Sequence, residues 1–114
     1  MKKLLLLSLF IPISLLADNV SLAWNHSVTN NDDHLAGYNI YYGVASRVYT
    51  NKIDVGYVTN TVISNLTFNT TYYFAATAYN VLGMESDYSD EAFYTVPIQP
   101  VPPSSPTNLR RLQF

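Results

Sequence analysis

The stretch TTYYFAATAY at residues 70–79 decides the fold. Its side chains fall into two alternating sets, as they do in a β-strand, where successive residues point to opposite faces. One set is Tyr72, Phe74, Ala76 and Ala78, and the other is Tyr73, Ala75, Thr77 and Tyr79. This is the longest strand that the sequence predicts, and shorter ones lie on both sides of it along the chain.

Shorter runs rich in β-forming residues precede and follow this strand. They predict strands at residues 20–24, 37–43, 48–55, 59–63 and 92–96. Turn-forming segments separate them, among them a polar loop at 25–34 and the glycines Gly56 and Gly83. Apolar residues show no helical spacing after residue 17. Several short strands at such intervals predict an all-β fold, an antiparallel sandwich of two sheets.

Four motifs in and between the predicted strands together resemble the fibronectin type III family, whose domains are immunoglobulin-like β-sandwiches. The residues LAW at 22–24 and GYNIYY at 37–42 are similar to strands B and C of that family. The spaced pattern from Leu66 through Thr70, Tyr72 and Phe74 to Asn80 resembles its E–F corner and strand F. The residues ESDYS at 85–89 resemble the start of its strand G. The resemblance covers about residues 20–97.

This resemblance implies roles for several residues and for the module as a whole. Trp24 would pack between the two sheets, and Tyr72 would be the corner tyrosine whose hydroxyl binds backbone near Leu66. The expected core residues are Trp24, Tyr38, Ile40, Leu66, Tyr72 and Phe74. The family resemblance further implies a non-catalytic module for binding, adhesion or spacing.

The first 17 residues have the three parts of a secretory signal peptide. Lys2 and Lys3 precede an apolar run at residues 4–16, and Ala17 is a small residue suited to a cleavage site. The run is shorter than the roughly 20 apolar residues that a stable membrane span requires. We therefore expect a signal peptide at 1–17, a domain at 18–96, and a secreted protein that is extracellular or periplasmic.

Strand A departs from the family pattern. Only Asp18 and Asn19 lie between the expected cleavage site and the strand at 20–24, so strand A is missing or shortened. The Pro-rich tail at 97–114 contains PPSSPTNLR, which resembles a family strand A. One interpretation is a flexible linker left from a longer multidomain chain. The other is self-association, in which residues 107–114 pair with the vacant edge beside strand B of this or a neighbouring copy.

Charge and cysteine content exclude several classes of function. Residues 18–100 contain two basic and eight acidic residues, a net charge of −6, which is opposite to the basic surface that nucleic acids need. The chain has no cysteine, which excludes disulfides, thiolate zinc sites and thiol nucleophiles. A domain without such links depends on its hydrophobic core.

Catalytic and metal-binding patterns are weak. His26, His34, Asp32 and Asp33 are explained by the chemistry of a polar turn, so we expect no metal site and no cofactor. A solvated acidic edge explains the second acidic group, which is Glu85, Asp87, Asp90 and Glu91. There is neither a phosphate-binding glycine loop nor a nucleophilic serine elbow, and we expect no enzyme.

The ten tyrosines are the best indication of a binding face. Alternation points Tyr41 outward from strand C, and Tyr73 and Tyr79 outward from the adjacent strand F, which would give an exposed stripe. Ordinary cross-strand pairing is the competing explanation. The sequence thus predicts a module for protein interaction, adhesion or spacing. The alternatives are a polysaccharide-binding accessory module that uses the tyrosines, and the remnant spacer of a larger protein.

Overall fold

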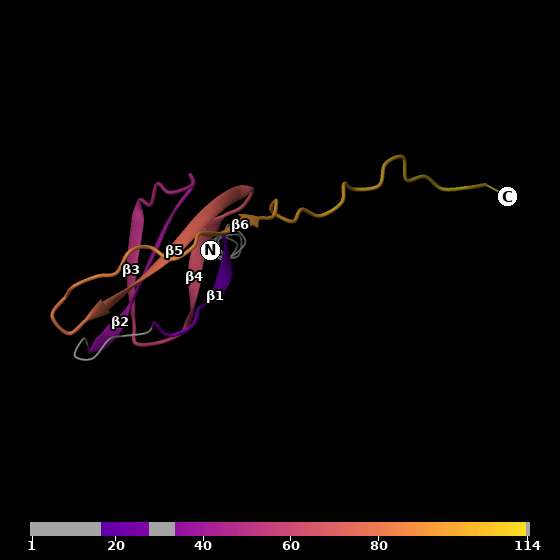
Figure 1. Cartoon of the computed structure of the whole chain (residues 1–114). Coiled ribbons are helices and arrows are strands. Elements are labelled where there is room, and N and C mark those ends of the chain that lie inside the picture. The colour runs from indigo at the N-terminus through magenta and orange to yellow at the C-terminus, as the bar shows by residue number, and fades with distance from the viewer. Residues whose placement is uncertain (1–16, 28–33, 114) are drawn as a thin grey trace, which may run out of the picture.

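The computed structural model describes residues 17–27 and 34–113, in which it has six β-strands and no helix (Figure 1). The strands are β1 (Ala17–Ala23), β2 (Leu35–Gly43), β3 (Asn51–Gly56), β4 (Asn60–Thr67), β5 (Thr70–Asn80) and β6 (Ala92–Val96). They form two antiparallel sheets, one in the order β1-β4 and the other in the order β3-β2-β5-β6. The predicted all-β class and two-sheet architecture are confirmed.

The strand β5 organises the larger sheet because it pairs with β2 on one side and with β6 on the other. Its even-numbered residues face the smaller sheet, where Tyr72 and Phe74 join the core. The core's fully enclosed residues come from β2, β4, β5 and β6: Ile40, Ile63, Leu66, Tyr72, Phe74 and Val96. Burying each such side chain contributes roughly 1.5–3 kcal/mol, and no disulfide adds to this.

The expected core residues divide into two groups by burial. Tyr38, Ile40, Leu66, Tyr72 and Phe74 are buried. Trp24 lies just past the end of β1 and is half-buried, with its ring against Tyr38 at 5.6 Å in an edge-to-face arrangement. Its indole Nε1 is buried with no hydrogen-bond partner among the described residues.

Four predicted strands have different boundaries in the structure. β1 begins at Ala17 and β2 at Leu35, earlier than the predicted starts at residues 20 and 37. The prediction of a strand at 48–55 is wrong at its start, because a tight turn with Arg47 in the left-handed region occupies residues 45–48 and β3 begins at Asn51. The strand predicted at 59–63 continues to Thr67 as β4, where it pairs with Ala17 of β1. Cross-strand pairing decides these ends, and residue type alone does not reveal it.

The corner between β4 and β5 is closed by Tyr72. Its hydroxyl oxygen accepts a hydrogen bond of 3.0 Å from the Thr67 backbone N–H, next to Leu66. Asn65 and Asn69 adopt the left-handed conformation on either side, which asparagine tolerates better than most residues. This contact is the one that the corner motif predicts.

Two serines hold the segment that precedes the last strand against β5. The Ser86 and Ser89 backbone N–H groups donate to the carbonyls of Ala78 and Ala76 on β5, each at 2.8 Å. Their hydroxyl oxygens accept hydrogen bonds from the backbone N–H groups of the same two alanines, at 2.9 and 2.8 Å. The chain is thereby held along β5 before β6 begins.

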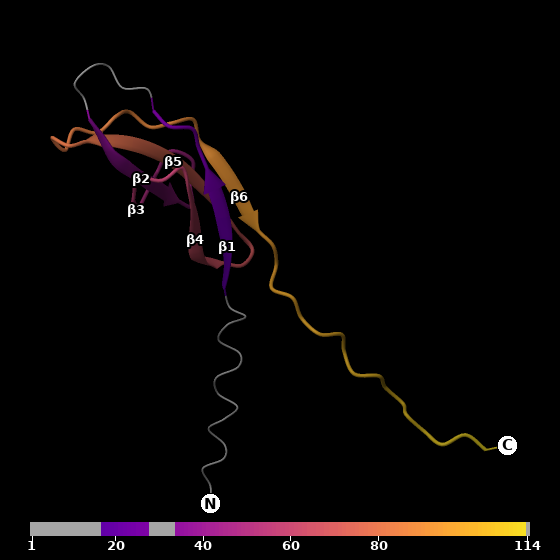
Figure 2. The same cartoon turned by 90° about the horizontal axis from the view of Figure 1, so that it is seen from below.

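One edge of β1 stays open, and the tail leaves the sandwich. Within the described ranges, β4 is the strand that pairs with β1, so no described strand A lies on its other side. Residues 97–113 form no strand, and Figures 1 and 2 show them running away from both sheets.

Candidate functional site

The three tyrosines that the sequence singles out lie on the outer face of the four-stranded sheet. Tyr41 is on β2, opposite Ala75 of β5, whereas Tyr73 and Tyr79 lie on β5 opposite Gly43 and Gly37. Their neighbours along the strands, such as Ile40 and Phe74, face the core. Alternation therefore assigns the correct side of the sheet.

The expectation of an open stripe needs correction, because each of the three rings is half-buried against a neighbour. The Tyr79 ring fills the space above Gly37, and its hydroxyl donates a 2.7 Å hydrogen bond to Asp54 Oδ1. This hydrogen bond lowers the pKa of Asp54. The Tyr73 ring packs against Phe93 of β6 at 6.3 Å. These two rings support the sheet, as in ordinary cross-strand pairing.

Tyr41 belongs to a compact cluster with Tyr49 and Tyr88, two residues that alternation did not single out. The Tyr88 ring contacts the Tyr41 and Tyr49 rings edge to face, each at 5.0 Å between ring centroids. Lys52 lies over the Tyr41 ring with its Nζ 5.5 Å from the centroid, a cation–π distance. Three separate segments thus form one aromatic surface.

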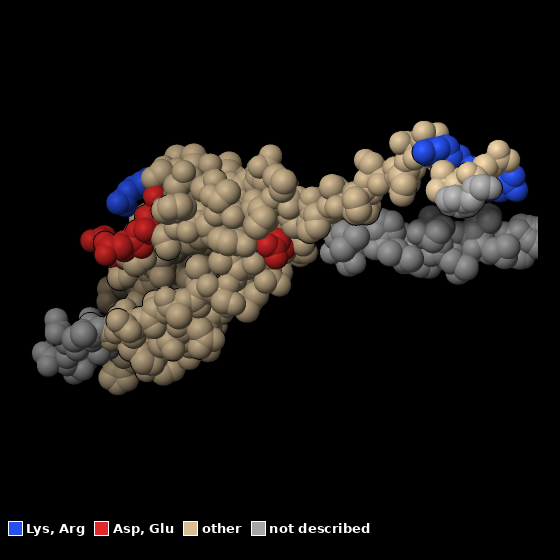
Figure 3. Space-filling model, turned by 90° about the vertical axis from the view of Figure 1, so that its right-hand side faces the viewer, with Lys and Arg blue, Asp and Glu red and all other residues tan. Residues whose placement is uncertain are grey.

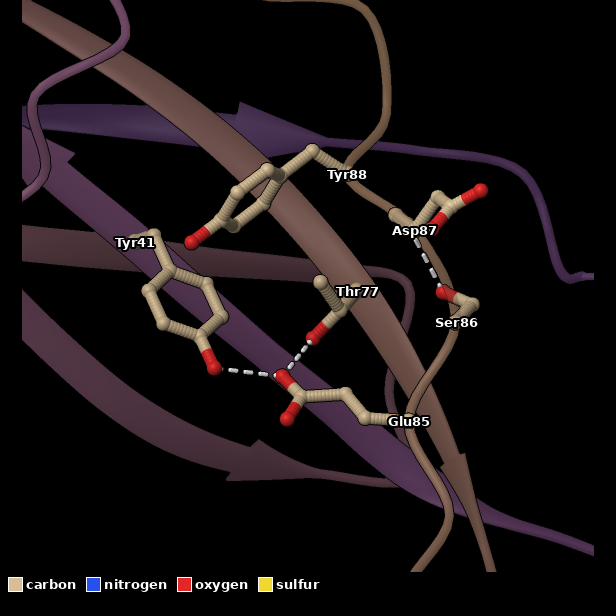
Figure 4. Close-up of a pocket in the computed structure, with 6 residues that line it drawn as sticks. All are labelled: Tyr41, Thr77, Glu85, Ser86, Asp87 and Tyr88. Carbon is tan, nitrogen blue, oxygen red and sulfur yellow. Dashed lines mark hydrogen bonds between the residues drawn. The ribbon is translucent and has the colours of Figure 1, made fainter.

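Glu85 anchors this cluster to the sheet (Figure 4). Its Oε2 accepts hydrogen bonds from the hydroxyls of Thr77 and Tyr41, each at 2.5 Å, and from Asn39 Nδ2 at 3.1 Å. Lys52 Nζ lies 4.0 Å from its Oε1. The hydrogen bond from Thr77, followed by the one from Tyr41, lowers the pKa of Glu85, whereas burial and the bond to Glu85 raise the pKa of Tyr41. The carboxylate is therefore ionised at neutral pH.

Glu91 likewise accepts several hydrogen bonds, from residues of the turn before β3. It accepts hydrogen bonds from the Ser46 and Tyr49 hydroxyls, both at 2.6 Å, and from the Arg47 backbone N–H at 2.8 Å. The bond from Ser46 is the largest cause that lowers the pKa of Glu91. Burial, then the bond to Glu91, raises the pKa of Tyr49 to about 12. The expectation that Glu85 and Glu91 merely form a solvated acidic edge is wrong, because both accept several hydrogen bonds from distant segments.

A shallow hollow of about 190 Å³ lies beside the cluster. It is lined by Tyr41, Thr77, Glu85, Ser86, Asp87 and Tyr88 (Figure 4). The Ser86 hydroxyl donates to the Asp87 carbonyl and accepts from the Ala78 N–H, so both of these hydrogen bonds are made with backbone groups. Because Glu85 is ionised, it is a poor general acid. The hollow offers hydrogen-bond acceptors and one half-exposed ring.

The histidines do not form a metal site with the residues that the structure describes. His26 Nδ1 lies 2.9 Å from the Tyr38 hydroxyl, and the His26 ring packs on Tyr57 at 5.1 Å. Asp32 and Asp33 of the same predicted turn lie outside the described residues. In the ranges 17–27 and 34–113, no three His, Cys, Asp or Glu side chains are close enough to hold a metal ion.

The turn between β5 and β6 presents an apolar surface that sequence reasoning missed. Val81, Leu82 and Met84 are 65%, 76% and 56% exposed. Asn80 fixes the turn, because its Oδ1 accepts from the Leu82 and Met84 N–H groups at 3.0 and 2.9 Å. Apolar side chains on both sides of the predicted turn residue Gly83 were the available signal, since turns usually carry polar residues.

Charged side chains are distributed unevenly over the molecule. Figure 3 shows a domain face that is largely free of charge, with acidic and basic groups gathered at one end and an acidic group near the start of the tail. Basic groups also lie far out on the tail. The charged residues of the tail are Arg110 and Arg111. None of the described residues forms a helix that is long and apolar enough to cross a membrane.

Comparisons with known proteins establish the fold. No protein-family model matches the chain, and no curated protein matches its sequence. The solution structure of the third fibronectin III domain of the human KIAA0343 protein is similar to this chain, with a TM-score of 0.53 and 21% identity. The match covers 80% of this chain and 78% of that one. The domain therefore has a fibronectin type III-like fold, as the sequence motifs predict.

Proposed function

We propose that the chain is an exported, non-catalytic module that binds a protein partner, with the turn at residues 81–84 as its contact. The observation that carries this proposal is the exposure of Val81, Leu82 and Met84 on a turn that is held in one shape. Exposed apolar groups that cluster are typical of interaction sites. A preorganised contact loses little conformational entropy when it binds.

Several further contacts support a rigid presentation of this turn. The Val81 N–H donates to the His34 carbonyl at 2.9 Å, which fastens the turn to the start of β2. The Gly83 N–H donates to the Asn80 carbonyl at 3.0 Å, and Gly83 has a φ of 84°, which glycine adopts without strain. The fold itself is consistent with a binding or spacer role.

Site-specific photo-crosslinking tests the proposed contact. A photoreactive residue replaces Leu82 in the full chain, and the chain is exposed to the surface and secreted proteins of its own host. Val101, which is 78% exposed on the tail, is the matched control position. We expect discrete products from position 82 alone, and competition by excess unlabelled wild type but not by Leu82→Asp. Identical products from both positions, or equal competition by the variant, would contradict the proposal.

Polysaccharide binding is the second candidate, and the hollow beside Tyr88 favours it. Tyr88 is 50% exposed, and the carboxylates of Glu85 and Asp87 line the same hollow. A ring beside hydrogen-bond acceptors suits the face and the hydroxyls of a sugar. Retention of the full chain on insoluble polysaccharides tests this candidate. Tyr88→Ala should abolish retention, whereas Tyr57→Ala, at a ring 60% exposed elsewhere, should not. Absence of retention on every matrix removes this candidate.

Export rests on the leader pattern of residues 1–17 and is tested separately. We expect the mature protein to begin at Asp18, which pairs with Leu66 at the start of the β1–β4 ladder. The Asp18 carboxylate also accepts a 3.1 Å hydrogen bond from the Tyr94 hydroxyl, so cleavage before this residue keeps the contact. N-terminal sequencing of the product from the host measures the cleavage position. An uncleaved product inside the cell would contradict export.

A further inference from the structure

The open edge of β1 offers backbone groups for pairing. β1 pairs with β4 along Ala17–Ala23, and no other described strand lies beside it. Its outward-facing residues Asn19, Ser21 and Ala23 are exposed. An edge strand with unpaired N–H and C=O groups is a template for a further strand.

An apolar groove lies at the C-terminal end of this edge, beside Leu22, Ala23 and Trp24. It measures about 260 Å³ and opens between β1 and the segment that leads into β6. Apolar side chains form most of it, among them Leu22, Trp24, Ile40, Phe74 and Ala92. The groove therefore lies over core residues, since Ile40 and Phe74 in its lining are each 2% exposed, and it adjoins the edge of β1 that no other described strand covers. A strand added to β1 would cover it.

The tail contains a segment that matches this groove in chemistry. Residues 107–112, TNLRRL, follow a spacer at 97–106 that holds five prolines, and they contain no proline themselves. Leu109 is 97% exposed and Leu112 is 59% exposed, so both have apolar surface to bury. Burial of such side chains is favourable by roughly 1.5–3 kcal/mol each.

Charge also favours this pairing. Residues 107–112 carry Arg110 and Arg111 and no acid, whereas residues 18–100 carry a net charge of −6. Asp90 lines the groove, and Asp18 lies on β1 itself. Opposite charges on a segment and its binding surface speed association and fix the register.

Geometry favours a second copy over the same copy. Val96 ends β6 opposite Thr70, close to the end of the sandwich where Ala17 begins β1. The ten-residue spacer extends about 31 Å in the polyproline conformation, but the seven residues of β1 span only about 23 Å. If the tail ran directly along its own β1, it would run parallel to that strand, and residue 107 would lie beyond the end of the strand. To pair antiparallel with its own β1, the tail would have to reverse its direction. Figures 1 and 2 show the tail leading away from its own domain.

We propose that residues 107–112 of one copy add as a strand to the free edge of β1 in a second copy. Leu109 then enters the apolar groove, and the neighbour's sandwich gains a strand beside β1, where no other described strand lies. Because the donor and acceptor surfaces differ, the contact is head-to-tail and links successive copies. This surface is separate from the turn at residues 81–84, so either proposal can fail without the other.

Cysteine cross-linking tests the pairing, because the chain has no cysteine of its own. Full-length Ser21→Cys and Arg110→Cys chains are mixed in equal amounts and oxidised. We expect a disulfide-linked heterodimer that outweighs both homodimers. The control mixture pairs Arg110→Cys with Asn51→Cys, which lies on β3, the far edge of the larger sheet. Equal cross-linking in both mixtures would overturn the proposal.

A double variant separates pairing between copies from pairing within one copy. Ser21→Cys/Arg110→Cys should give a ladder of linked oligomers on oxidation. A monomer with an internal disulfide would overturn the proposal and would assign the segment to its own β1. Leu109→Asp should abolish both the ladder and any concentration-dependent mass, whereas Val101→Asp in the spacer should preserve them. Persistence of the ladder in Leu109→Asp would also overturn the proposal.

Discussion

The Glu85 carboxylate accepts hydrogen bonds from three neighbouring side chains on the outer face of the sheet, those of Asn39, Tyr41 and Thr77. Asn39 and Thr77 are 5% and 4% exposed, so their polar groups depend on the Glu85 carboxylate as acceptor. We expect Glu85→Ala to lower the free energy of unfolding by about 1–3 kcal/mol, because it leaves buried donors unpaired. Denaturant unfolding measures this loss. Asp87→Ala is the control, since this carboxylate accepts no hydrogen bond from a described residue, and an equal loss there would contradict the assignment.

The same carboxylates should make the domain sensitive to acid. Hydrogen bonds lower the pKa of Glu85 and of Glu91 in the folded state below the ordinary value of 4.5. A lowered folded-state pKa contributes stability above the unfolded pKa, and this stability is lost as pH falls through the folded value. Melting temperature should therefore decline below about pH 4.5. A Glu85→Gln variant should show a shallower decline, and parallel curves would count against the role of Glu85.

Tyr49 should make the domain lose stability at alkaline pH as well. Its folded-state pKa of about 12 lies above the ordinary 10.0, so the protonated hydroxyl is favoured by folding. A raised folded-state pKa contributes stability below pH 10, and this contribution is lost as pH rises toward 12. Ultraviolet titration of tyrosinate should show a late-ionising group that is absent in Tyr49→Phe. If the variant retains the same late group, Tyr49 does not produce it.

The turn between β2 and β3 requires a glycine at position 43. A Cβ built on Gly43 would lie 2.3 Å from the Val48 carbonyl oxygen, whereas the nearest atoms to one on Gly37 belong to the far end of the Tyr79 side chain, with backbone of Gly56 at 3.1 Å. Backbone cannot yield as a side chain can, so Gly43→Ala should destabilise the domain more than Gly37→Ala, by roughly 1–3 kcal/mol. Thermal unfolding of both variants measures the difference. The opposite order would show that Tyr79 is fixed more firmly than the turn.

Strand alternation predicted most of the fold because it is a local property. The face that each residue of β5 presents follows from its position alone, and Phe74 and Tyr73 lie on the predicted sides. The start of β3 was wrong because the preceding turn is fixed by Glu91, which lies 44 residues from Arg47 in the chain. The cluster of Tyr41, Tyr49 and Tyr88 was missed for the same reason. Sequence patterns identify the side of a sheet that a residue faces. Contacts with residues that fold back from a distant loop are seen only in the structure.

The molecule as a whole has a small core that lies beside the open edge of β1. It contains no cysteine, and the apolar groove beside β1 lies over buried core residues such as Ile40 and Phe74. Folded domains retain only about 5–15 kcal/mol of stability, so each large core residue matters in a domain of this size. The half-buried Trp24 borders the groove and packs on Tyr38, and it therefore links the core to the open edge.

Replacement of Trp24 should accordingly affect the entire domain. Truncation of a packed tryptophan costs about 3–5 kcal/mol, and because this ring is half-buried we expect Trp24→Ala to fall near the lower end. In a domain of this size that loss lowers Tm by on the order of 10–25 °C. Trp24→Phe should cost less, because it keeps an aromatic ring against Tyr38 and removes an indole N–H that has no described partner. Calorimetry measures both variants. A melt of Trp24→Ala within a few degrees of wild type would mean that the core closes without this ring.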